Sequence, residues 1–221
     1  GSCFARGLER ILTARDFDVR STSKAFDSWE MQYEKGNPIG VTNRYNTASI
    51  RNEFVWHLGG NGIPDETLLE TRDGLYFDPH ATPVAAPLDM EAQLERRKIW
   101  GGMCEQLSKV DIVVLTLGLV EVWYDKECNL YCNSAPDARL AAKYPDRFEV
   151  HILNYQDNLA NLETVYSVLK AKNPNARMVV TVSPVPLIKT FSGEDIVTAN
   201  TYSKSTLRAV AGDFVRGKGD V

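Results

Sequence analysis

Residues 112–123, IVVLTLGLVEVW, indicate the fold class of this chain. They form a continuous apolar run, rich in valine, that is too short to cross a membrane as a helix. Such runs are typical of strands that are buried on both faces of a parallel sheet. We therefore predict a buried parallel strand that ends at Gly118.

A helix and a second apolar run follow this strand along the chain. Residues 155–172 carry apolar side chains at helical spacing and stop before an Asn-Pro pair. The stretch ARMVVTVSPVPL, residues 176–187, is then predicted to be another buried strand, ended by two prolines. Strand, helix and strand in this order predict an α/β domain with a mostly parallel sheet. Its functional loops should lie at the carboxyl ends of strands, here 118–123 and 183–187.

The remaining periodicity predicts three further helices and one hairpin. Ser49 has a residue type that often caps a helix, and apolar residues follow it at helical spacing. Glycines and prolines make residues 59–88 irregular, with a hairpin across RDGLYFD. The predicted helices are 4–15, 49–58 and 90–109.

Composition narrows the class of protein and of partner. The chain has 221 residues, of which 43% are hydrophobic and 24% charged, so it fits one domain with an ordinary core. With 25 basic and 29 acidic residues the net charge is -4, and no basic stripe is present, so we expect no nucleic-acid partner. No apolar run has the length of a membrane span, and no signal peptide precedes the first helix.

Cysteine spacing and glycine motifs indicate neither a metal nor a cofactor. The four cysteines are Cys3, Cys104, Cys128 and Cys132, and the spacing of the last pair matches no zinc or thioredoxin motif. We interpret them as reduced thiols of a cytoplasmic protein. No nicotinamide or nucleotide motif is present, because the glycine-rich residues 59–62 lack a preceding strand.

Seven ordered blocks carry a resemblance to a known family. They are Gly1-Ser2-Cys3-Phe4-Ala5, NPIG (37–40), YNTASI (45–50), TLGLVEVW (116–123), NP (173–174), TVSPVPL (181–187) and ANTYSKS (199–205). With them the chain resembles the GSCFA family, which is named for the opening motif. That family is similar to the SGNH or GDSL hydrolases, which are esterases with a serine nucleophile near the N-terminus.

The resemblance implies a fold and a nucleophile. The fold would be a three-layer, flavodoxin-like α/β domain with a mostly parallel sheet, and residues 1–221 would form a single domain. Ser2 falls on the position of the nucleophile, which makes the alternative origin of Gly1-Ser2, a cleaved expression tag, the weaker explanation. Cys3 could be a nucleophile too, but it is more simply a small buried apolar residue.

The resemblance also implies an oxyanion hole, and here the chain departs from the hydrolase pattern. That pattern places an asparagine two residues after Gly118, where this chain has Val120. We therefore expect Asn46 to supply a side-chain donor, beside the backbone N–H groups of Ser2 and Gly40. The alternative for Asn46 is a turn or a helix cap.

Glu121 and Trp123, which follow the predicted strand, could bind a substrate. The carboxylate of Glu121 could position a histidine or bind a sugar hydroxyl, and the indole of Trp123 could stack on a sugar ring. Alternatively, Glu121 bonds local backbone N–H groups and Trp123 closes the core.

The expected catalytic base is missing from the printed sequence. Hydrolases of this kind carry their histidine in an Asp-x-x-His block, which none of His57, His80 and His151 matches. We therefore expect the base beyond Val221 and a first strand before Gly1, so that the domain is truncated at both ends.

These inferences give one expected function and one alternative. We expect a serine esterase or O-acyltransferase that acts on a small-molecule or glycan acyl ester, such as O-acetyl groups of a bacterial polysaccharide. The alternative is a non-catalytic glycan-binding or assembly protein that keeps the fold. The sequence leaves the oligomeric state open.

Overall fold

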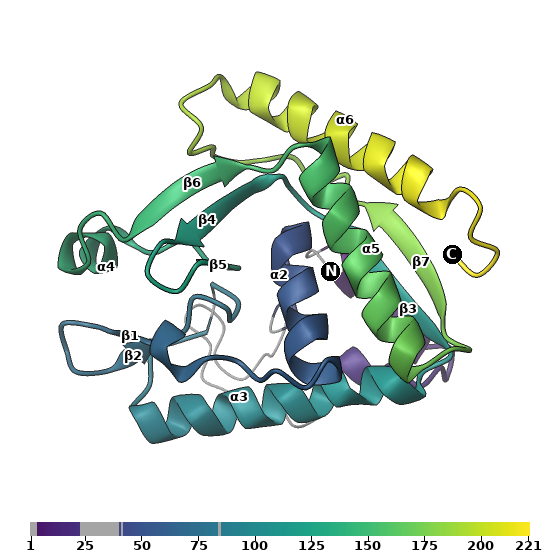
Figure 1. Cartoon of the computed structure of the whole chain (residues 1–221), viewed down its shortest axis with the longest axis horizontal. Coiled ribbons are helices and arrows are strands. Elements are labelled where there is room, and N and C mark those ends of the chain that lie inside the picture. Colours follow the sequence, from purple (N-terminus) through teal and green to yellow (C-terminus); the bar gives the residue numbers. More distant parts are fainter. Residues whose placement is uncertain (1–3, 23–39, 41, 84) are drawn as a thin grey trace.

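The computed structural model describes residues 4–22, 40, 42–83 and 85–221, and it shows a mixed α/β structure with parallel and antiparallel strands (Figure 1). Strands β3 (Ile112–Leu117) and β7 (Arg177–Val182) pair in parallel over six residues each. Helix α5 (Tyr155–Lys172) makes the crossover to β7. The predicted order of strand, helix and strand is therefore confirmed, but β7 is not the buried strand that we predicted, because Met178 is its one buried residue.

A second, antiparallel sheet lies between β3 and α5 along the chain. It contains β4 (Glu121–Asp125), β5 (Leu130–Tyr131) and β6 (Phe148–Ile152), in the order β5-β4-β6. Of the loop that we predicted at residues 118–123, residues 118–120 are a loop, whereas residues 121–123 belong to β4, and the described strands do not form a mostly parallel sheet. Only residues 118–120 separate β3 from β4, which is far too short for the crossover that parallel pairing requires.

Several of the other elements lie close to predicted ones. Helix α3 follows the predicted 90–109 segment and ends in a 3-10 turn, and the predicted hairpin is the pair β1–β2. The remaining elements, of which η1, η4 and α4 were not predicted, are α1 (Ala5–Thr13), η1 (Arg20–Thr22), η4 (Asp65–Thr67), β1 (Leu69–Glu70), β2 (Tyr76–Phe77), α3 (Met90–Glu105), η5 (Gln106–Lys109), α4 (Ala138–Lys143) and α6 (Ile196–Val215).

Helix α2 (Thr47–Glu53) lies in the middle of the molecule, between α3, α5 and the antiparallel sheet (Figure 1). Six of its seven residues are buried, and a π-helical turn, η3 (Phe54–Leu58), continues it. The Thr47 hydroxyl donates to Oδ1 of Asn158 on α5, at 2.7 Å. A buried short helix of this kind fixes the position of the segment that precedes it.

Helix α6 holds the loop that joins β3 to β4. The backbone N–H of Val120 donates to Oγ of Ser203 at 3.1 Å, and Nζ of Lys204 donates to the carbonyl of Gly118 at 2.6 Å. Ser203 is fully buried. Because the side chains bond to backbone groups, the conformation of the loop depends on α6.

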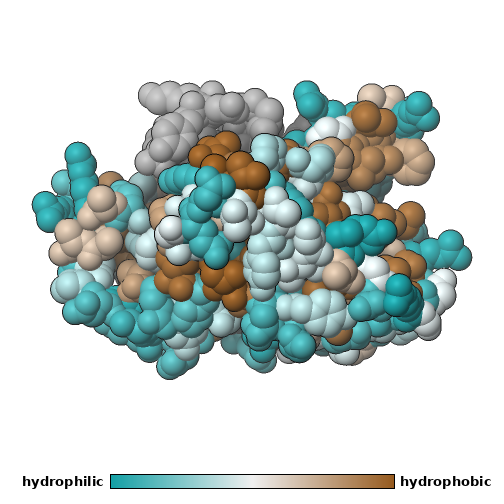
Figure 2. Space-filling view, turned by 90° about the horizontal axis from the view of Figure 1, so that it is seen from above, coloured by the Kyte–Doolittle hydropathy of each residue, from teal (hydrophilic) through white to brown (hydrophobic). Residues whose placement is uncertain are grey.

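The surface carries apolar side chains among the polar ones. Figure 2 shows several hydrophobic patches, in brown, on the face seen from above. The most exposed large apolar residues among those described are Phe17, Ile188 and Val197. Within the described residues, no helix is both long and apolar enough to cross a membrane.

We predict that Ser203→Ala destabilises the protein by about 1–3 kcal/mol, because it leaves the buried N–H of Val120 without an acceptor. Ser205→Ala, on the exposed side of the same helix, is the control and should change the free energy of unfolding by less than about 0.5 kcal/mol. Urea unfolding measures both. Equal effects of the two substitutions would contradict the role of Ser203.

Candidate functional site

The segment that ends at Asn46 lies beside the loop after β3. The backbone N–H of Leu119 donates to the carbonyl of Tyr45 at 2.9 Å, although the two residues are far apart in sequence. The structure therefore brings the predicted blocks around Asn46 and Gly118 together at the carboxyl end of β3.

The helix after the opening motif is bound to the same segment. Arg6 of α1 donates a hydrogen bond to the hydroxyl of Thr42. Gly40 is buried, has a φ of 98°, and accepts from the backbone N–H of Asn43 at 2.9 Å. A positive φ of this size favours glycine, so the residue type at position 40 follows from the backbone. Ser2 and Cys3 lie outside the described residues, as does most of the NPIG block.

Asn46 is the N-cap of α2. Its Oδ1 accepts from the backbone N–H of Ser49 at 2.7 Å, and its Nδ2 donates to the carbonyl of Cys132 at 3.2 Å. The cap, which we weighed as the alternative, is therefore present, and the helix begins before Ser49. The role of Asn46 in an oxyanion hole stays a prediction. It would depend on the second hydrogen of Nδ2, because the first is donated to Cys132.

Glu121 is buried and bonds a backbone N–H group, although that group is distant in sequence and not local as in the alternative that we weighed. Its Oε2 accepts from the N–H of Phe191 at 2.9 Å, and its Oε1 accepts from the hydroxyl of Thr190. The carboxylate thereby fixes the loop between β7 and α6 against β4.

Trp123 lies beside Phe191 in the same region. The two rings are edge to face, with their centroids 5.2 Å apart. Nε1 of Trp123 is buried and has no hydrogen-bond partner among the described residues, and 44% of Phe191 is exposed. An aromatic pair with one exposed ring could stack on a sugar.

His151 differs from the other two histidines in its exposure and contacts. It lies on β6, with Nε2 2.7 Å from Oε1 of Glu149 and Nδ1 3.2 Å from the hydroxyl of Tyr131. Among the described residues, no hydrogen bond joins a serine hydroxyl to a histidine ring. The described part of the chain therefore contains no assembled Ser-His pair.

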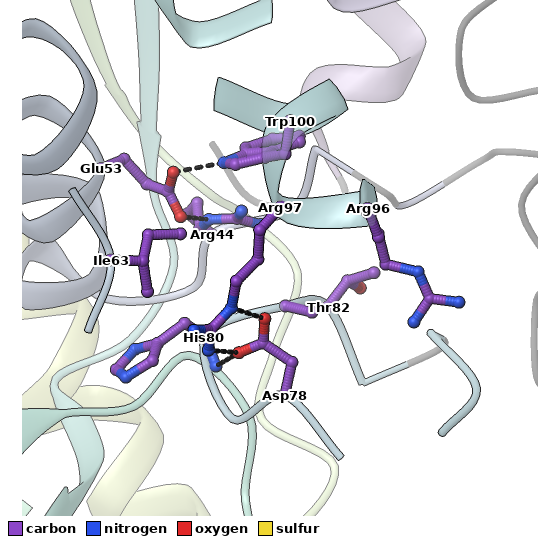
Figure 3. Close-up of a pocket in the computed structure, with 10 residues that line it drawn as sticks. Arg44, Glu53, Ile63, Asp78, His80, Thr82, Arg96, Arg97 and Trp100 are labelled. Atoms are coloured by element: carbon purple, nitrogen blue, oxygen red, sulfur yellow. Dashed lines mark hydrogen bonds and ion pairs between the residues drawn. The ribbon is translucent and has the colours of Figure 1, made fainter. Parts of the chain in front are cut away.

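A buried ionic layer, which we did not predict, lies between α2, α3 and residues 42–46. Nε of Arg44 donates to Oε1 of Glu53 at 2.7 Å, and the Trp100 indole donates to Oε2 of the same carboxylate (Figure 3). The Arg44 guanidinium also lies 4.1 Å from the centroid of the Trp100 ring. Burial alone would raise the pKa of Glu53, but the Arg44 charge, His57 and the Trp100 hydrogen bond together outweigh burial and lower that pKa to about 2.

A second ion pair continues this layer. Arg97 of α3 donates to both carboxylate oxygens of Asp78, at 2.7 and 3.0 Å, and to Oγ1 of Thr67 at 2.7 Å. Burial alone would raise the pKa of Asp78, but the two-point contact with Arg97 leaves it lowered. The pair joins α3 to the irregular segment that contains His80.

His80 is buried in this layer. Its backbone N–H donates to Oδ1 of Asp78 at 2.9 Å, and its ring packs edge to face on Trp56, with centroids 4.8 Å apart. Nε2 has no hydrogen-bond partner among the described residues. Burial, aided by the charges of Arg97 and Arg44, lowers the pKa of His80 to about 4. The ring is therefore neutral at pH 7.

The two ion pairs and His80 line one small cavity (Figure 3). Its volume is about 20 Å³, which is enough for one water molecule and too small for an acyl ester. The layer is therefore a structural support for the segment that leads to Asn46, and it is not a substrate site in this conformation.

Comparison with known proteins decides the family. The model of the GSCFA family matches residues 1–221. The chain belongs to the GSCFA family. No curated protein and no solved structure matches it.

No sequence motif marks the two buried ion pairs of this GSCFA chain, which we did not predict. Arg44 and Glu53 are nine positions apart, and Asp78 and Arg97 are 19 apart, which matches no motif spacing. One feature of the sequence does indicate this layer. Asp78-Pro79-His80 places two titratable residues in a segment that is otherwise poor in charge.

We predict that the protein loses about 2–3 kcal/mol of stability between pH 6.5 and pH 4.5 because of His80. The unfolded chain binds a proton at His80 near pH 6.5, whereas the folded chain binds it only near pH 4, so protonation favours unfolding. His80→Gln should remove most of this loss, and His151→Gln should not. Chemical unfolding at a series of pH values measures the effect, and an unchanged slope in His80→Gln would contradict it.

Proposed function

We propose that this GSCFA protein is an SGNH-type serine esterase or O-acyltransferase that acts on a small acyl ester. The substrate class that we propose is the O-acetyl groups of a bacterial polysaccharide. In this proposal, the described strands β3 and β7 belong to a three-layer flavodoxin-like domain, into which the antiparallel sheet is inserted.

The observation that carries the proposal is the hydrogen bond from Leu119 to Tyr45. It supports the proposal because it joins two sequence blocks that the resemblance assigns to one active site. The carboxyl end of β3, where the two blocks meet, is also the edge at which open α/β sheets bind their ligands.

In the proposed reaction, Ser2 Oγ attacks the acyl carbonyl and loses its proton to a histidine. The alcohol then leaves with that proton, and an acyl-enzyme remains. Water or a sugar hydroxyl takes the acyl group in the second step, which restores the Ser2 hydroxyl. We do not assign the base to His151, because both of its ring nitrogens are engaged.

Backbone N–H groups would contribute more to the oxyanion hole than the side chain of Asn46. We assign this role to the N–H groups of Ser2 and Gly40, with the Gly118 loop beside them. Asn46 would act as a positioning residue, since its Oδ1 caps α2 and its Nδ2 is bonded to Cys132. Glu121 would hold the β7–α6 loop, and Trp123 with Phe191 would contact the sugar.

A glycan-binding or assembly protein remains the second candidate. Val120 in place of an oxyanion asparagine favours it, as does the aromatic pair of Trp123 and Phe191. Either function would fit a reducing compartment such as the cytoplasm, because the three cysteines in the described residues are free.

We predict that a fluorophosphonate labels the full-length protein stoichiometrically and that Ser2→Ala abolishes both labelling and turnover of a short-chain acyl ester. Ser108→Ala, which changes a surface hydroxyl on η5, is the control and should retain both. Intact-protein mass spectrometry counts the label. Binding of an acetylated glycan without labelling or turnover would instead favour the second candidate.

We predict that Asn46→Ser lowers kcat less than tenfold, because serine can also cap α2. The loss of the bond to Cys132 should cost about 1 kcal/mol of stability. Asn46→Ala removes the cap as well and should cost about 1 kcal/mol more. A folded Asn46→Ser protein with kcat reduced about 100-fold would show that Asn46 is itself an oxyanion donor.

A further inference from the structure

Three side chains from two helices place nitrogen, oxygen and sulfur ligand atoms together in the interior. We propose that Glu53, His57 and Cys104 bind one Zn²⁺ ion. The site is independent of the proposed hydrolase chemistry, and its test does not use enzymatic activity.

The distances between the ligand atoms fit a tetrahedral ion. Nε2 of His57 lies 3.3 Å from Oε2 of Glu53, and Sγ of Cys104 lies 3.6 Å from the same oxygen. One ligand atom from each of the three residues lies within 4.8 Å of the other two. Bonds of about 2.0–2.3 Å around a tetrahedral zinc separate its ligands by roughly 3.3–3.7 Å. Two of the contacts already lie in this range.

The backbone between Glu53 and His57 is the π-helical turn η3 (Phe54–Leu58), closed by a hydrogen bond from Gly59 N–H to the Phe54 carbonyl at 2.9 Å. Single π-turns in helices often occur at functional sites. Here Glu53 precedes the π-turn and His57 lies in it, at positions i and i+4. Both residues lie near Cys104 of α3.

His57 is nine-tenths buried, and its Nε2 makes no hydrogen bond within the described residues. Its nearest polar neighbour is the Glu53 carboxylate, at 3.3 Å. Nε2 therefore faces the Glu53 carboxylate without a well-aligned hydrogen bond to it, and an ion bound between the two groups would hold both.

Gly101 of α3 makes room for the ring of His57. A Cβ added at Gly101 would lie only 3.0 Å from Nδ1 and 3.2 Å from Cε1 of His57. Any larger residue at position 101 would force the ring or the helix to shift. The glycine therefore allows the ring to approach the cluster.

Glu53 has the hydrogen-bonded surroundings of a metal-binding carboxylate. Arg44 holds Oε1 at 2.7 Å, which leaves Oε2 facing His57 and Cys104, and Trp100 donates to Oε2. Such outer contacts commonly orient metal-binding carboxylates. The Arg44 charge also compensates one of the two negative charges that Glu53 and a Cys104 thiolate would bring.

Cys104 must lose its proton to bind the ion. In the structure the buried thiol donates to Oε2 of Glu53. When Zn²⁺ binds, a Zn–S bond replaces the S–H bond and the proton passes to solvent. Three protein ligands leave the fourth position to water or to a small ligand.

An open cavity gives the ion access from solvent. It has a volume of about 300 Å³ and is lined by His57, Gly101, Gly102 and Glu105, among others. The charges of its lining balance, with Asp65 and Glu105 beside Arg97 and Lys98, so the access of the ion depends on the opening at His57.

The test is equilibrium dialysis of the metal-free full-length protein against Zn²⁺, with the bound metal measured by elemental analysis. We expect one equivalent to bind to the wild type, and at least a tenfold weaker affinity in His57→Gln and in Cys104→Ser. Cys132→Ser is the matched control, because Cys132 is also buried and free but lies outside the cluster, and it should bind as the wild type does.

A second measurement covers variants that fail to fold. In the wild type, Zn²⁺ should protect Cys104 from alkylation, as located by peptide mass spectrometry, and Co²⁺ should give a thiolate charge-transfer band. Absence of bound Zn²⁺ from the wild type would overturn the proposal, and so would unchanged affinity in folded Cys104→Ser or equal alkylation of Cys104 with and without Zn²⁺.

Discussion

The buried ion pair between Arg44 and Glu53 is the contact on which the surrounding structure depends. Removing two charges from water costs several kcal/mol per ion, and this cost is offset only where the pair is well aligned and its remaining atoms are bonded. Here Trp100 supplies a further hydrogen bond to the carboxylate. Loss of one partner would leave an unpaired buried charge, at a cost of about 3–5 kcal/mol.

The ion pair sets the position of the segment that reaches the β3–β4 loop. Arg44 and Tyr45 are adjacent, so the contact that holds Arg44 on α2 also presents the Tyr45 carbonyl to Leu119. From the other side, Ser203 and Lys204 of α6 hold the same loop. The proposed catalytic edge therefore depends on helices that are far apart in sequence.

The sequence predicts the elements whose side chains follow a simple period. Helix α5 was predicted with both ends correct, because its apolar side chains follow the helical period and an Asn-Pro pair follows it. Leu162, Val165 and Leu169 of this helix are fully buried. Strands β3 and β7 were predicted from their valine-rich runs. The antiparallel sheet was missed because residues 118–123 continue the apolar run of β3, and composition alone does not show that β3 ends at Leu117 and that a strand of another sheet begins at Glu121.

The candidate site could be predicted only in part. The blocks around Gly40, Asn46 and Gly118 were identified, but the cap role of Asn46 depends on where α2 begins, and periodicity placed that start near Ser49. The ion pairs and the Glu53-His57-Cys104 cluster join residues up to 51 positions apart. Such contacts arise from the packing of α2 on α3, which no local pattern in the sequence describes.

The most direct test of the account is a crystal structure of the full-length protein after reaction with a fluorophosphonate. The account predicts a phosphonyl group on Ser2 Oγ, with its oxygen bonded to the backbone N–H of Gly40 and with the loop of Gly118 beside it. An unmodified Ser2 that lies on the far side of β3 from Gly118 would contradict the account.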